Sequence, residues 1–421
     1  MRNWSLSNIF KGDKVIWMIF FILCIISIIE VYSASSSLSY KGGNYWNPII
    51  KHVGTILLGA FSLIVVMNVK CKYFKLISVP MLLFAILTQM MVLSMGEATN
   101  DASRWLDIMG IKFQPSEIGK MSLVLCTAQI LSAMQTENGA HKRAFWYIFI
   151  ISSIIIGLTV FENLSTAALL GLTITLMMFI GRVPMKQLGK FIGTLALLGS
   201  LGLGFILLFG HSENAANEKQ QLTEVAARIQ EEPKEEGMID KMFHRMDTWK
   251  ARILKFTDDE YIAPENYDLD KDGQVAHANI AVASANYVGK GPGNSNERDF
   301  LSQAFSDFIF AIIIEEMGLL GAGLVAALYI FLLFRVGRIA NRCENSFPAF
   351  LAMGIAILLV SQALFNMAVA VGLAPVTGQP LPLISKGGTS TVINCVYIGV
   401  LLSISRFAKK RPETEEGTAK G

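Results

Sequence analysis

The amino-acid sequence predicts an all-α polytopic membrane protein with about ten transmembrane helices. Three observations support this fold class. Apolar residues make up 52% of the 421 residues and charged residues only 16%, whereas ordinary globular domains carry roughly 25% charged residues. The mean hydropathy is +0.47. Apolar segments of roughly 17–25 residues, the length that crosses a bilayer as a helix, recur along the chain.

Ten segments are expected to span the membrane. The first follows basic residues, as the core of a signal peptide would. It is longer than such a core, has no A-x-A cleavage site after it and is followed by many similar segments, so we interpret it as an uncleaved first helix. The ten expected spans are 15–34, 49–68, 76–95, 114–134, 145–161, 165–181, 190–210, 307–334, 347–371 and 389–405.

The basic residues indicate how these spans are oriented. If the N-terminus is cytoplasmic, most Lys and Arg residues fall on the inner side, as the positive-inside rule expects. The short outer loops and their edges then hold only Lys41, Lys51, Arg104, Lys112 and Lys386. We therefore expect both termini in the cytoplasm and one large extracytoplasmic loop, 211–306. The polar end of the chain, 407–421, is expected to be a disordered cytoplasmic tail.

Charge and cysteine content argue against several other classes of protein. The formal net charge of +3 is small, and the basic residues are scattered over short loops, so no nucleic-acid partner is expected. The five cysteines contain no CxxC pair and the five histidines are dispersed. No Cys/His metal site is therefore expected.

One group of polar residues leads into the fourth expected span, in 100-NDASRWLDIMGIKFQPSEIGKMSL-123. Pro115 suits the first turn of a helix, and Glu117 and Lys120 stand three residues apart on one face of it. They either neutralise each other as an intrahelical ion pair or line a polar cleft with Arg104 at its mouth. The spacing leaves both interpretations open.

A second group, 375-PVTGQPLPLISKGGTSTV-392, contains three prolines and three glycines and leads into the last span. A Gly-rich helix start that bears Ser or Thr presents free backbone N–H groups and the positive end of the helix dipole. Gly387, Gly388 and Ser390 could therefore bind a phosphate group, or they could form an ordinary cap and turn. The neighbouring Lys386 favours anion binding.

Asp307 opens an apolar run that also carries Glu315 and Glu316. Ser306 or Asp307 could simply cap the helix that begins there. Glu315 lies about 12 Å further along the axis, too deep to share the mouth of a site with Asp307. We expect Glu315 and Glu316 to pair with polar groups inside the bundle, and close helix packing to explain the mostly small residues 32–35.

Six motifs occur in order along nearly the whole chain. They are YSAS at 32–35, SRWLDIMGIKFQPSEIGK at 103–120, STA at 165–167, GKGPG at 289–293, SDFIFAIIIEEMG at 306–318 and TGQPLPLISKGGTS at 377–390. Together they resemble the motifs of the SEDS family (shape, elongation, division and sporulation), the multi-spanning FtsW and RodA proteins of bacteria. The resemblance implies a single SEDS-type membrane domain over residues 1–421.

The resemblance also implies a function. It is that of a peptidoglycan glycosyltransferase that polymerises lipid II at the outer face of the bacterial cytoplasmic (inner) membrane, in the division-type role. The implied partners are a class B penicillin-binding protein, which crosslinks the strands, and other division proteins. The acid that the family uses as its essential catalytic residue falls on Asp307, and the QPSE-x-x-K acid and base fall on Glu117 and Lys120.

The chain departs from the usual family pattern at several positions. Phe305 stands where histidine is common, and Lys386 stands where an aromatic residue is common. Gln303 replaces a usual glutamate, and ENLSTA at 162–167 lacks the acid and the glycine of the usual D-L-G-T-A. These departures concern substrate contacts and leave Asp307 in place.

The expected mechanism assigns a role to each candidate. Asp307 would take the proton of the attacking sugar 4-hydroxyl, a contribution of about 10²–10⁴-fold. Lys120 and Arg104, with Lys386 and the backbone amides after it, would stabilise the departing pyrophosphate. Alternatively, Asp307 would hold a divalent cation, Mg²⁺ or Mn²⁺, against the diphosphate. No other cofactor or metal is expected.

Three rival functions remain at this level. Ten spans with intramembrane charges also suit a lipid II flippase, although a transport path should continue polar residues toward the cytoplasm, and here they gather on the outer side. An elongation-type RodA polymerase would use the same chemistry as a division-type enzyme. A scaffold that only recruits division proteins would tolerate every acid substitution.

Overall fold

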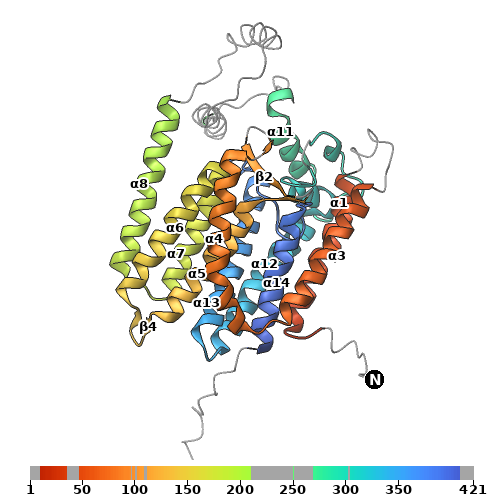
Figure 1. The fold of residues 1–421 in the computed structure, drawn as a ribbon. Helices are drawn as coiled ribbons and strands as arrows, with labels where there is room; N and C mark the ends of the chain where they lie inside the picture. The colour runs from red at the N-terminus through yellow and green to blue at the C-terminus, as the bar shows by residue number, and fades with distance from the viewer. Residues whose placement is uncertain are drawn as a thin grey trace, which may run out of the picture.

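The computed structural model describes residues 10–35, 47–95, 97–99, 102–108, 111–209, 250, 269–301 and 304–407. In this part of the chain, long helices form one bundle, with short strands at its ends (Figure 1). The helices are α1 (Lys14–Ala34), α3 (Asn47–Met67), α4 (Cys71–Met95), α5 (Pro115–Ala133), α6 (Lys142–Glu162), α7 (Leu164–Ile180), α8 (Met185–Phe209), α11 (Leu269–Ala283), α12 (Ile309–Arg342), α13 (Ser346–Ala370) and α14 (Thr389–Phe407). A 3-10 turn, η3, covers Glu297–Asp299.

The predicted fold class is confirmed. Each of the ten expected spans coincides with one long helix, and seven of these helices are apolar and long enough to cross a membrane. These seven are α1, α3, α4, α6, α12, α13 and α14, while α7 is apolar but shorter. The exact number of crossings stays a prediction, and so does the large outer loop. Most of that loop lies outside the described residues, as does the predicted tail beyond Phe407.

Short strands add a feature that the sequence did not predict. β1 (Glu97–Thr99), β2 (Ala102–Ile108) and β3 (Ile111–Phe113) form an antiparallel sheet in the order β1-β2-β3. A second pair, β4 (Gln135–Thr136) and β5 (Gly139–Ala140), joins α5 to α6 at the other end of the bundle. The first sheet packs beside α4 and the start of α5, and therefore fixes β2 next to the upper end of the bundle.

The first and last helices are tied together at their chain-terminal ends. The backbone N–H of Asp13, the N-cap of α1, donates to Ser405 Oγ at 3.0 Å. Its carboxylate pairs with Arg335 of α12, with 2.7 Å between Oδ2 and the guanidinium. Burial raises the pKa of Asp13, but the hydrogen bonds from Arg335 and from the amide of Ile16 outweigh burial and hold this pKa below its ordinary value. The start of α1 and the end of α14 therefore lie at the same end of the bundle.

Small residues let helices approach closely in the bundle. A Cβ on Gly59 of α3 would come within 2.6 Å of Cys395 Sγ, and one on Gly399 of α14 within 2.8 Å of the carbonyl oxygen of Leu63. Such close contact is the usual way in which membrane helices associate. α13 is buried along most of its length, whereas α8 stands at the edge beside α6 and α7 (Figure 1).

α12 is broken near its start, at Gly318, where φ is 69° and ψ is −174°. The expected single span from residue 307 is therefore a helix that begins at Ile309 and is interrupted nine residues later. The backbone of 286–291 supplies hydrogen bonds to 315–320 across the break. A Cβ on Gly318 would lie 2.4 Å from the nitrogen of Gly289, so this crossing requires glycine.

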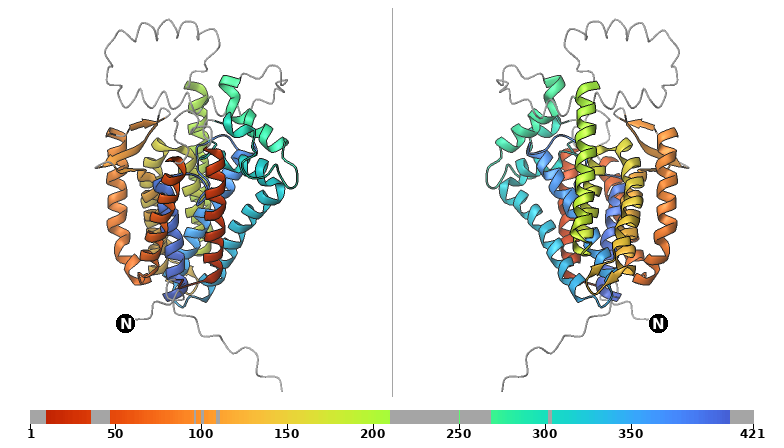
Figure 2. Two further views of the ribbon diagram at one scale, coloured as in Figure 1. Left: turned by 90° about the vertical axis from the view of Figure 1, so that its right-hand side faces the viewer. Right: turned by 90° about the vertical axis from the view of Figure 1, so that its left-hand side faces the viewer.

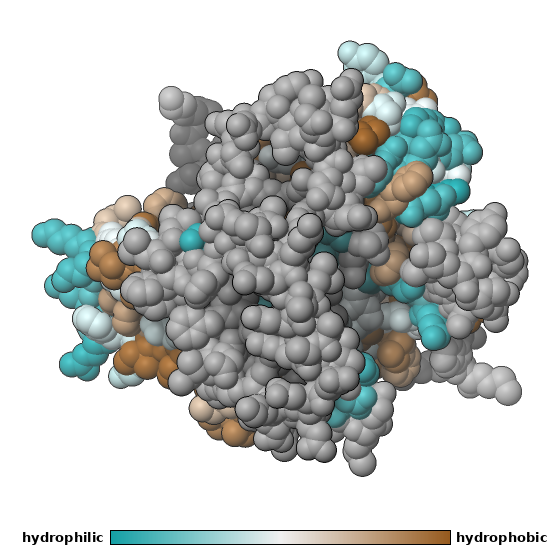
Figure 3. Space-filling view, turned by 90° about the horizontal axis from the view of Figure 1, so that it is seen from above, coloured by the Kyte–Doolittle hydropathy of each residue, from teal (hydrophilic) through white to brown (hydrophobic). Residues whose placement is uncertain are grey.

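The upper end of the bundle carries α11 and the segment after it, which pack on α12 (Figure 2). Ala278 and Ala281 of α11 are buried. A view onto this end shows hydrophilic and hydrophobic side chains of the described residues mixed around its rim (Figure 3). The expectation that 275–289 lies at the membrane interface stays a prediction.

Candidate functional site

A cavity of about 350 Å³ lies near the upper end of the bundle, away from the Asp13–Arg335 pair. Most of the candidates from the sequence line it, although they come from segments far apart in the chain. The candidates in its wall are Glu117, Asp307, Lys386, Gly387, Gly388 and Ser390. Trp105, which β2 positions, lines the cavity as well.

Four helices begin at this cavity. Gln114 is the N-cap of α5 and Asn163 that of α7, and both line the wall. Asp307 precedes the N-cap of α12, and Gly388 precedes the first residue of α14. The caps of α5 and α12 make no side-chain cap hydrogen bond. Asn163 Oδ1 accepts from the amides of Ser165 and Thr166 and so caps α7. Each of the four helix starts still carries a partial positive charge of about half a unit, so their convergence favours an anion.

Asp307 lies in the irregular turn 304–308 that precedes α12, and its side chain is half-buried. Ser306 Oγ donates to Asp307 Oδ1 at 2.9 Å. The N-cap of α12 is Phe308, so neither Ser306 nor Asp307 occupies the cap position that the simpler interpretation required. The carboxylate instead belongs to the wall of the cavity.

Glu117 and Lys120 form the intrahelical ion pair that was one alternative, and Glu117 also lines the cavity, which was the other. Their side chains form a buried ion pair with 2.8 Å between Nζ and Oε1, and Lys120 Nζ also donates to Gln362 Oε1 at 3.1 Å. Glu117 still lines the cavity, and its second oxygen is buried with no hydrogen-bond partner among the described residues. Lys120 lies behind Glu117 and does not line the cavity. In this arrangement its ammonium contacts Glu117 and Gln362, and a direct contact with a pyrophosphate in the cavity is not available to it.

Lys386 places a positive charge in the wall. Its Nζ lies 4.9 Å from the centre of the Phe305 ring, within range of a cation–π contact. Burial, followed by the charge of nearby Lys51, lowers the pKa of Lys386 below its ordinary value. The ammonium is therefore held where it is short of counter-charge, which favours an anionic ligand.

The turn after Lys386 forms an ordinary helix cap, which was one of the two interpretations that the sequence allowed for Gly387, Gly388 and Ser390. Both the backbone N–H and the hydroxyl of Ser390 donate to the carbonyl oxygen of Gly387 at 3.0 Å. A Cβ on Gly387 would lie 2.1 Å from Ser390 Oγ, and Gly388 has φ of 51°. The glycines thus make a tight turn that brings backbone into the cavity wall. The side chain of Arg104 lies outside the described residues.

Several amide side chains at the site were missed in the sequence. Asn163 Nδ2 donates to the carbonyl oxygen of Thr377 at 3.3 Å, and Gln379 Nε2 donates to Thr166 Oγ1 at 2.5 Å. Gln362 and Asn366 are buried on one face of α13. Their signal in the sequence is two polar residues four apart inside an apolar span, which is costly unless it has a role.

Comparison with known proteins agrees with the motifs and the fold. Residues 13–410 match the FtsW, RodA and SpoVE family, described as "Cell cycle protein". The chain belongs to this family. It is 30% identical to a "Probable peptidoglycan glycosyltransferase FtsW" of Geobacter sp. (strain M18) over 93% of this chain and 96% of that protein. A protein of the same description from Geobacter metallireducens is 28% identical over 97% and 98%.

Solved structures of the FtsW, RodA and SpoVE family share the fold. One was described for the coordination of polymerization and crosslinking by a peptidoglycan synthase complex, and it aligns with a TM-score of 0.66 at 20% identity, over 94% of this chain and 98% of that one. The Thermus thermophilus rod shape determining protein RodA aligns with a TM-score of 0.62 at 17% identity, over 95% and 98%.

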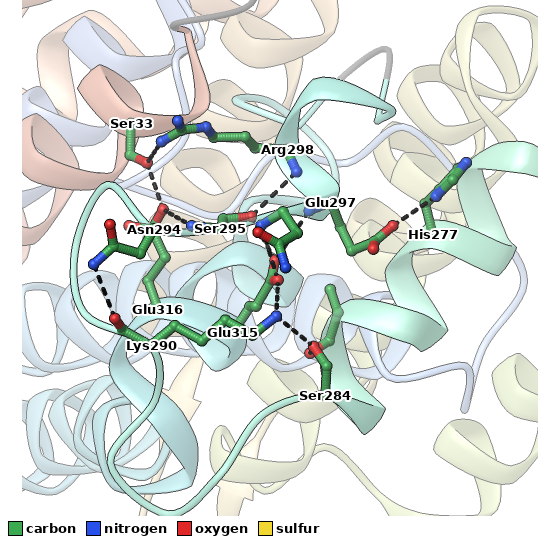
Figure 4. A network of polar contacts seen from close by, with 12 residues as sticks. Ser33, His277, Ser284, Lys290, Asn294, Ser295, Glu297, Arg298, Glu315 and Glu316 are labelled. Atoms are coloured by element: carbon green, nitrogen blue, oxygen red, sulfur yellow. Dashed lines mark hydrogen bonds and ion pairs between the residues drawn. The ribbon is translucent and has the colours of Figure 1, made fainter.

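The two adjacent acids of α12, Glu315 and Glu316, are not among the residues that line the cavity. They belong to a separate network of polar contacts (Figure 4). Glu315 accepts from Lys290 Nζ at 2.6 Å and from the amide of Asn296 at 3.0 Å. Glu316 accepts from the amide of Gly293 at 2.9 Å. The prediction that these acids find polar partners is confirmed: most partners come from the segment 290–297, and Ser33 of α1 supplies one from inside the bundle.

Ser33 takes part in the same network, which corrects its interpretation as a small packing residue. Its hydroxyl donates to Glu316 Oε1 and accepts from Arg298 at 3.0 Å (Figure 4). α1, α12 and the segment before the cavity are thereby joined by one cluster of hydrogen bonds. We call Glu315, Glu316 and their partners in 290–298 the acid clamp.

Few metal-binding side chains are available to a cation in the cavity. Among the described residues, no three His, Cys, Asp or Glu side chains gather into a metal-binding group. The carboxylates in the cavity wall are those of Asp307 and Glu117, and Glu117 is already paired with Lys120. Magnesium is commonly bound by one or two carboxylates together with substrate phosphates, so these residues fit a cation that arrives with a diphosphate.

Proposed function

We propose that this chain is a peptidoglycan glycosyltransferase that polymerises lipid II into glycan strands for septal cell-wall synthesis. The observation that carries the proposal is a single cavity in which the carboxylate of Asp307 faces a wall built from four helix starts and Lys386. A base and an anion site side by side are what transfer of a sugar from a lipid diphosphate requires. The names of the FtsW relatives support the same activity.

The reaction forms one bond and breaks one. The 4-hydroxyl oxygen of one sugar attacks the anomeric carbon of another, and the bond from that carbon to the lipid diphosphate breaks, which inverts the configuration. Asp307 takes the hydroxyl proton as the new bond forms, a role that contributes about 10²–10⁴-fold. Without a base, the attacking oxygen would become a positively charged oxonium.

The diphosphate leaves with negative charge that the cavity must stabilise. Lys386 and the free N–H groups at the starts of α5, α12 and α14 provide positive potential that is already in place before the reaction. Such preorganised groups act on the charge that develops in the transition state. Lys386 is therefore a diphosphate-binding residue, and Gly387 and Gly388 allow the backbone to approach.

Glu117 also belongs to the wall of the cavity. Its second oxygen is a buried acceptor, suited to a hydroxyl or amide N–H of a sugar. Lys120 and Gln362 hold the Glu117 side chain from behind, at 2.8 and 3.1 Å from Lys120 Nζ. In the alternative in which a divalent cation binds with the diphosphate, Asp307 would hold that cation instead of acting as the base, and the cation would neutralise charge on the leaving group.

The proposal also includes the face of the membrane at which the cavity lies and the protein that acts with this chain. The cavity lies at the outer face of the bacterial inner membrane, as supported by the positive-inside orientation and by its position away from the joined ends of α1 and α14. A class B penicillin-binding protein crosslinks the strands. The solved relative in a complex that coordinates polymerization and crosslinking supports such a partner.

The test uses the purified chain with a class B penicillin-binding protein and lipid II. We expect uncrosslinked glycan polymer when a β-lactam blocks the transpeptidase, because the partner does not perform polymerisation. Absence of polymer with every cognate partner, together with lipid II scrambling in proteoliposomes, would instead identify a flippase.

A further inference from the structure

The backbone that carries Asp307 is held by three consecutive hydrogen bonds from outside its own turn. The carbonyl oxygen of Phe305 accepts from the amide of Lys386 at 3.0 Å. The carbonyl oxygen of Ser306 accepts from Ser385 Oγ at 2.6 Å, and that of Asp307 accepts from Asn366 Nδ2 at 2.8 Å. These three residues are in an irregular turn, so no helical hydrogen-bond pattern fixes their orientation.

The two side chains that donate these bonds are themselves fixed. Asn366 is 1% exposed, and its Nδ2 also donates to the carbonyl oxygen of Gln379 at 2.7 Å. Ser385 is 3% exposed, and its oxygen accepts from the amide of Leu381 at 2.8 Å. Each donor is thus held in one orientation. Because its own position is fixed, it also fixes the position of the backbone carbonyl group to which it donates.

The turn 379–386 that faces Asp307 is held in the same manner. Three of its carbonyl oxygens accept from the side chains of Gln362, Tyr329 and Ser27. These donors belong to α13, α12 and α1, so the turn is anchored to three helices. Loss of one of these three bonds therefore leaves the turn anchored by the other two, whereas Asn366 and Ser385 bind the backbone of Ser306 and Asp307 directly.

The other end of the Asp307 segment is closed by the acid clamp. Glu315 accepts from the amide of Asn296, which joins two positions 19 residues apart on either side of Asp307 (Figure 4). The clamp thus joins described residues on both sides of the turn 304–308, and Asn366 and Ser385 hold that turn directly. Between these points the carboxylate of Asp307 faces the cavity.

We propose that Asn366 and Ser385 are positioning residues that hold the main chain of Asp307 so that its carboxylate is aimed at the attacking hydroxyl. The inference rests on the proposed function, because it assigns to Asp307 the role of base. Proton transfer requires the base within hydrogen-bond reach of its proton, and a displacement of about 1 Å can cost about 10²-fold in rate. Neither side chain needs to touch substrate for this effect.

A purely structural role makes a different prediction. If the two hydrogen bonds only stabilised the fold, their loss would lower the melting temperature and the amount of active protein, while each folded molecule would keep its kcat. Loss of positioning lowers kcat and leaves KM for lipid II nearly unchanged, because the substrate still binds the same wall. The division of the effect between kcat and KM therefore separates the two roles.

The experiment measures initial rates of glycan polymer formation over a range of lipid II concentrations, with the chain in complex with its class B partner. We expect Asn366→Leu, which keeps the volume and removes the donor, to lower kcat by about 10–100-fold, with KM within about twofold of wild type. Ser385→Ala should act in the same direction with a smaller loss, and it decides the test if Asn366→Leu does not insert.

Tyr329→Phe is the matched control, because it removes a buried side-chain hydrogen bond to Pro382 in the same turn without touching the Asp307 backbone. It should lower the melting temperature while kcat stays close to wild type. If Asn366→Leu and Ser385→Ala keep wild-type kcat, or if Tyr329→Phe lowers kcat equally, the positioning role is wrong. A wild-type chain that makes no polymer contradicts the proposed function itself.

Discussion

The acids in and near the first turns of α12 fall into two sets, which differ in what surrounds their oxygens. Glu315 and Glu316 are fully buried, lie outside the cavity wall and accept hydrogen bonds from a lysine, hydroxyls and several backbone amides. Asp307 is half-buried and lines the cavity with Glu117. An acid in this bundle is therefore a candidate for chemistry where it lines the cavity, and is structural where the protein's own donors surround it.

The largest effect is expected from Asp307→Asn. Asparagine keeps the size and caps a helix about as well as aspartate, but it is neither a base nor a strong cation ligand. We expect the variant to be inserted and to bind its partner, yet to make no glycan polymer from lipid II. Asp299→Asn in η3 is the matched control and should retain activity, because this carboxylate is exposed and does not line the cavity. Near-normal polymer from Asp307→Asn would remove the distinction between the two sets of acids.

Reversing the second cavity acid and its partner is expected to have the next largest effect. In Glu117→Lys with Lys120→Glu, an i,i+3 ion pair remains available, but an ammonium replaces the acceptor at the wall and a carboxylate faces Gln362 Oε1. We expect polymerisation to fall by about 10²-fold or more in a protein that still inserts, measured as polymer per inserted molecule. Normal polymer would show that the pair serves only to neutralise charge.

A substitution in the acid clamp should lower the stability of the protein more than its catalytic activity. Glu315→Gln removes the charge that Lys290 and the amide of Asn296 contact, and a lost buried hydrogen bond costs about 1–3 kcal/mol. We expect a lower melting temperature in detergent and faster proteolysis of 284–301, with activity per folded molecule reduced by less than about tenfold. A complete loss of polymer with unchanged melting would place Glu315 with the cavity acids.

The smallest effect concerns the pH dependence of the cavity cation. Because burial and Lys51 lower the pKa of Lys386, its positive charge is lost at a lower pH than that of an ordinary lysine as pH rises. If this charge binds the diphosphate, the rate should fall on that alkaline side. Lys386→Arg should change the rate at neutral pH by less than about threefold and should extend activity to higher pH, because arginine stays protonated.

Lys51→Gln provides a second check on the same charge. Removal of the Lys51 charge takes away one cause that lowers the Lys386 pKa, so the alkaline decline of the rate should move to higher pH. Rates for the three proteins are compared from neutral pH upward in one buffer series. Identical alkaline declines for all of them would show that another group titrates there.

The existence and approximate position of each long helix could be predicted from the sequence, although α4 and α8 begin five residues earlier and α12 ends eight residues later than expected. A membrane-spanning helix satisfies its own backbone hydrogen bonds, so each span is a local property of one apolar segment. The start of α5 at Pro115 and of α7 after Asn163 follow from local capping chemistry. The break of α12 at Gly318 was missed, because it depends on the close approach of Gly289, which lies 29 residues earlier in the chain.

The candidate site was predictable in its residue types but not in its arrangement. The sequence placed Glu117, Asp307 and the turn after Lys386 at the same end of their helices, and the cavity brings them together. It assigned Lys120 to the cleft, whereas the ammonium lies behind Glu117 and binds Gln362. Spacing along one helix defines which residues share a face, but not which neighbouring helix covers that face.

By itself, the sequence determined the membrane environment, the helices, the acids and the family to which the chain belongs, because each of these depends on composition or on short motifs. Tertiary structure alone decided which acid meets which donor. Asn366 reaches the backbone of Asp307 across 59 residues, and Ser33 reaches Glu316 across 283. Contacts of this kind form only when distant helices pack side by side, and no local pattern of residues specifies the partner.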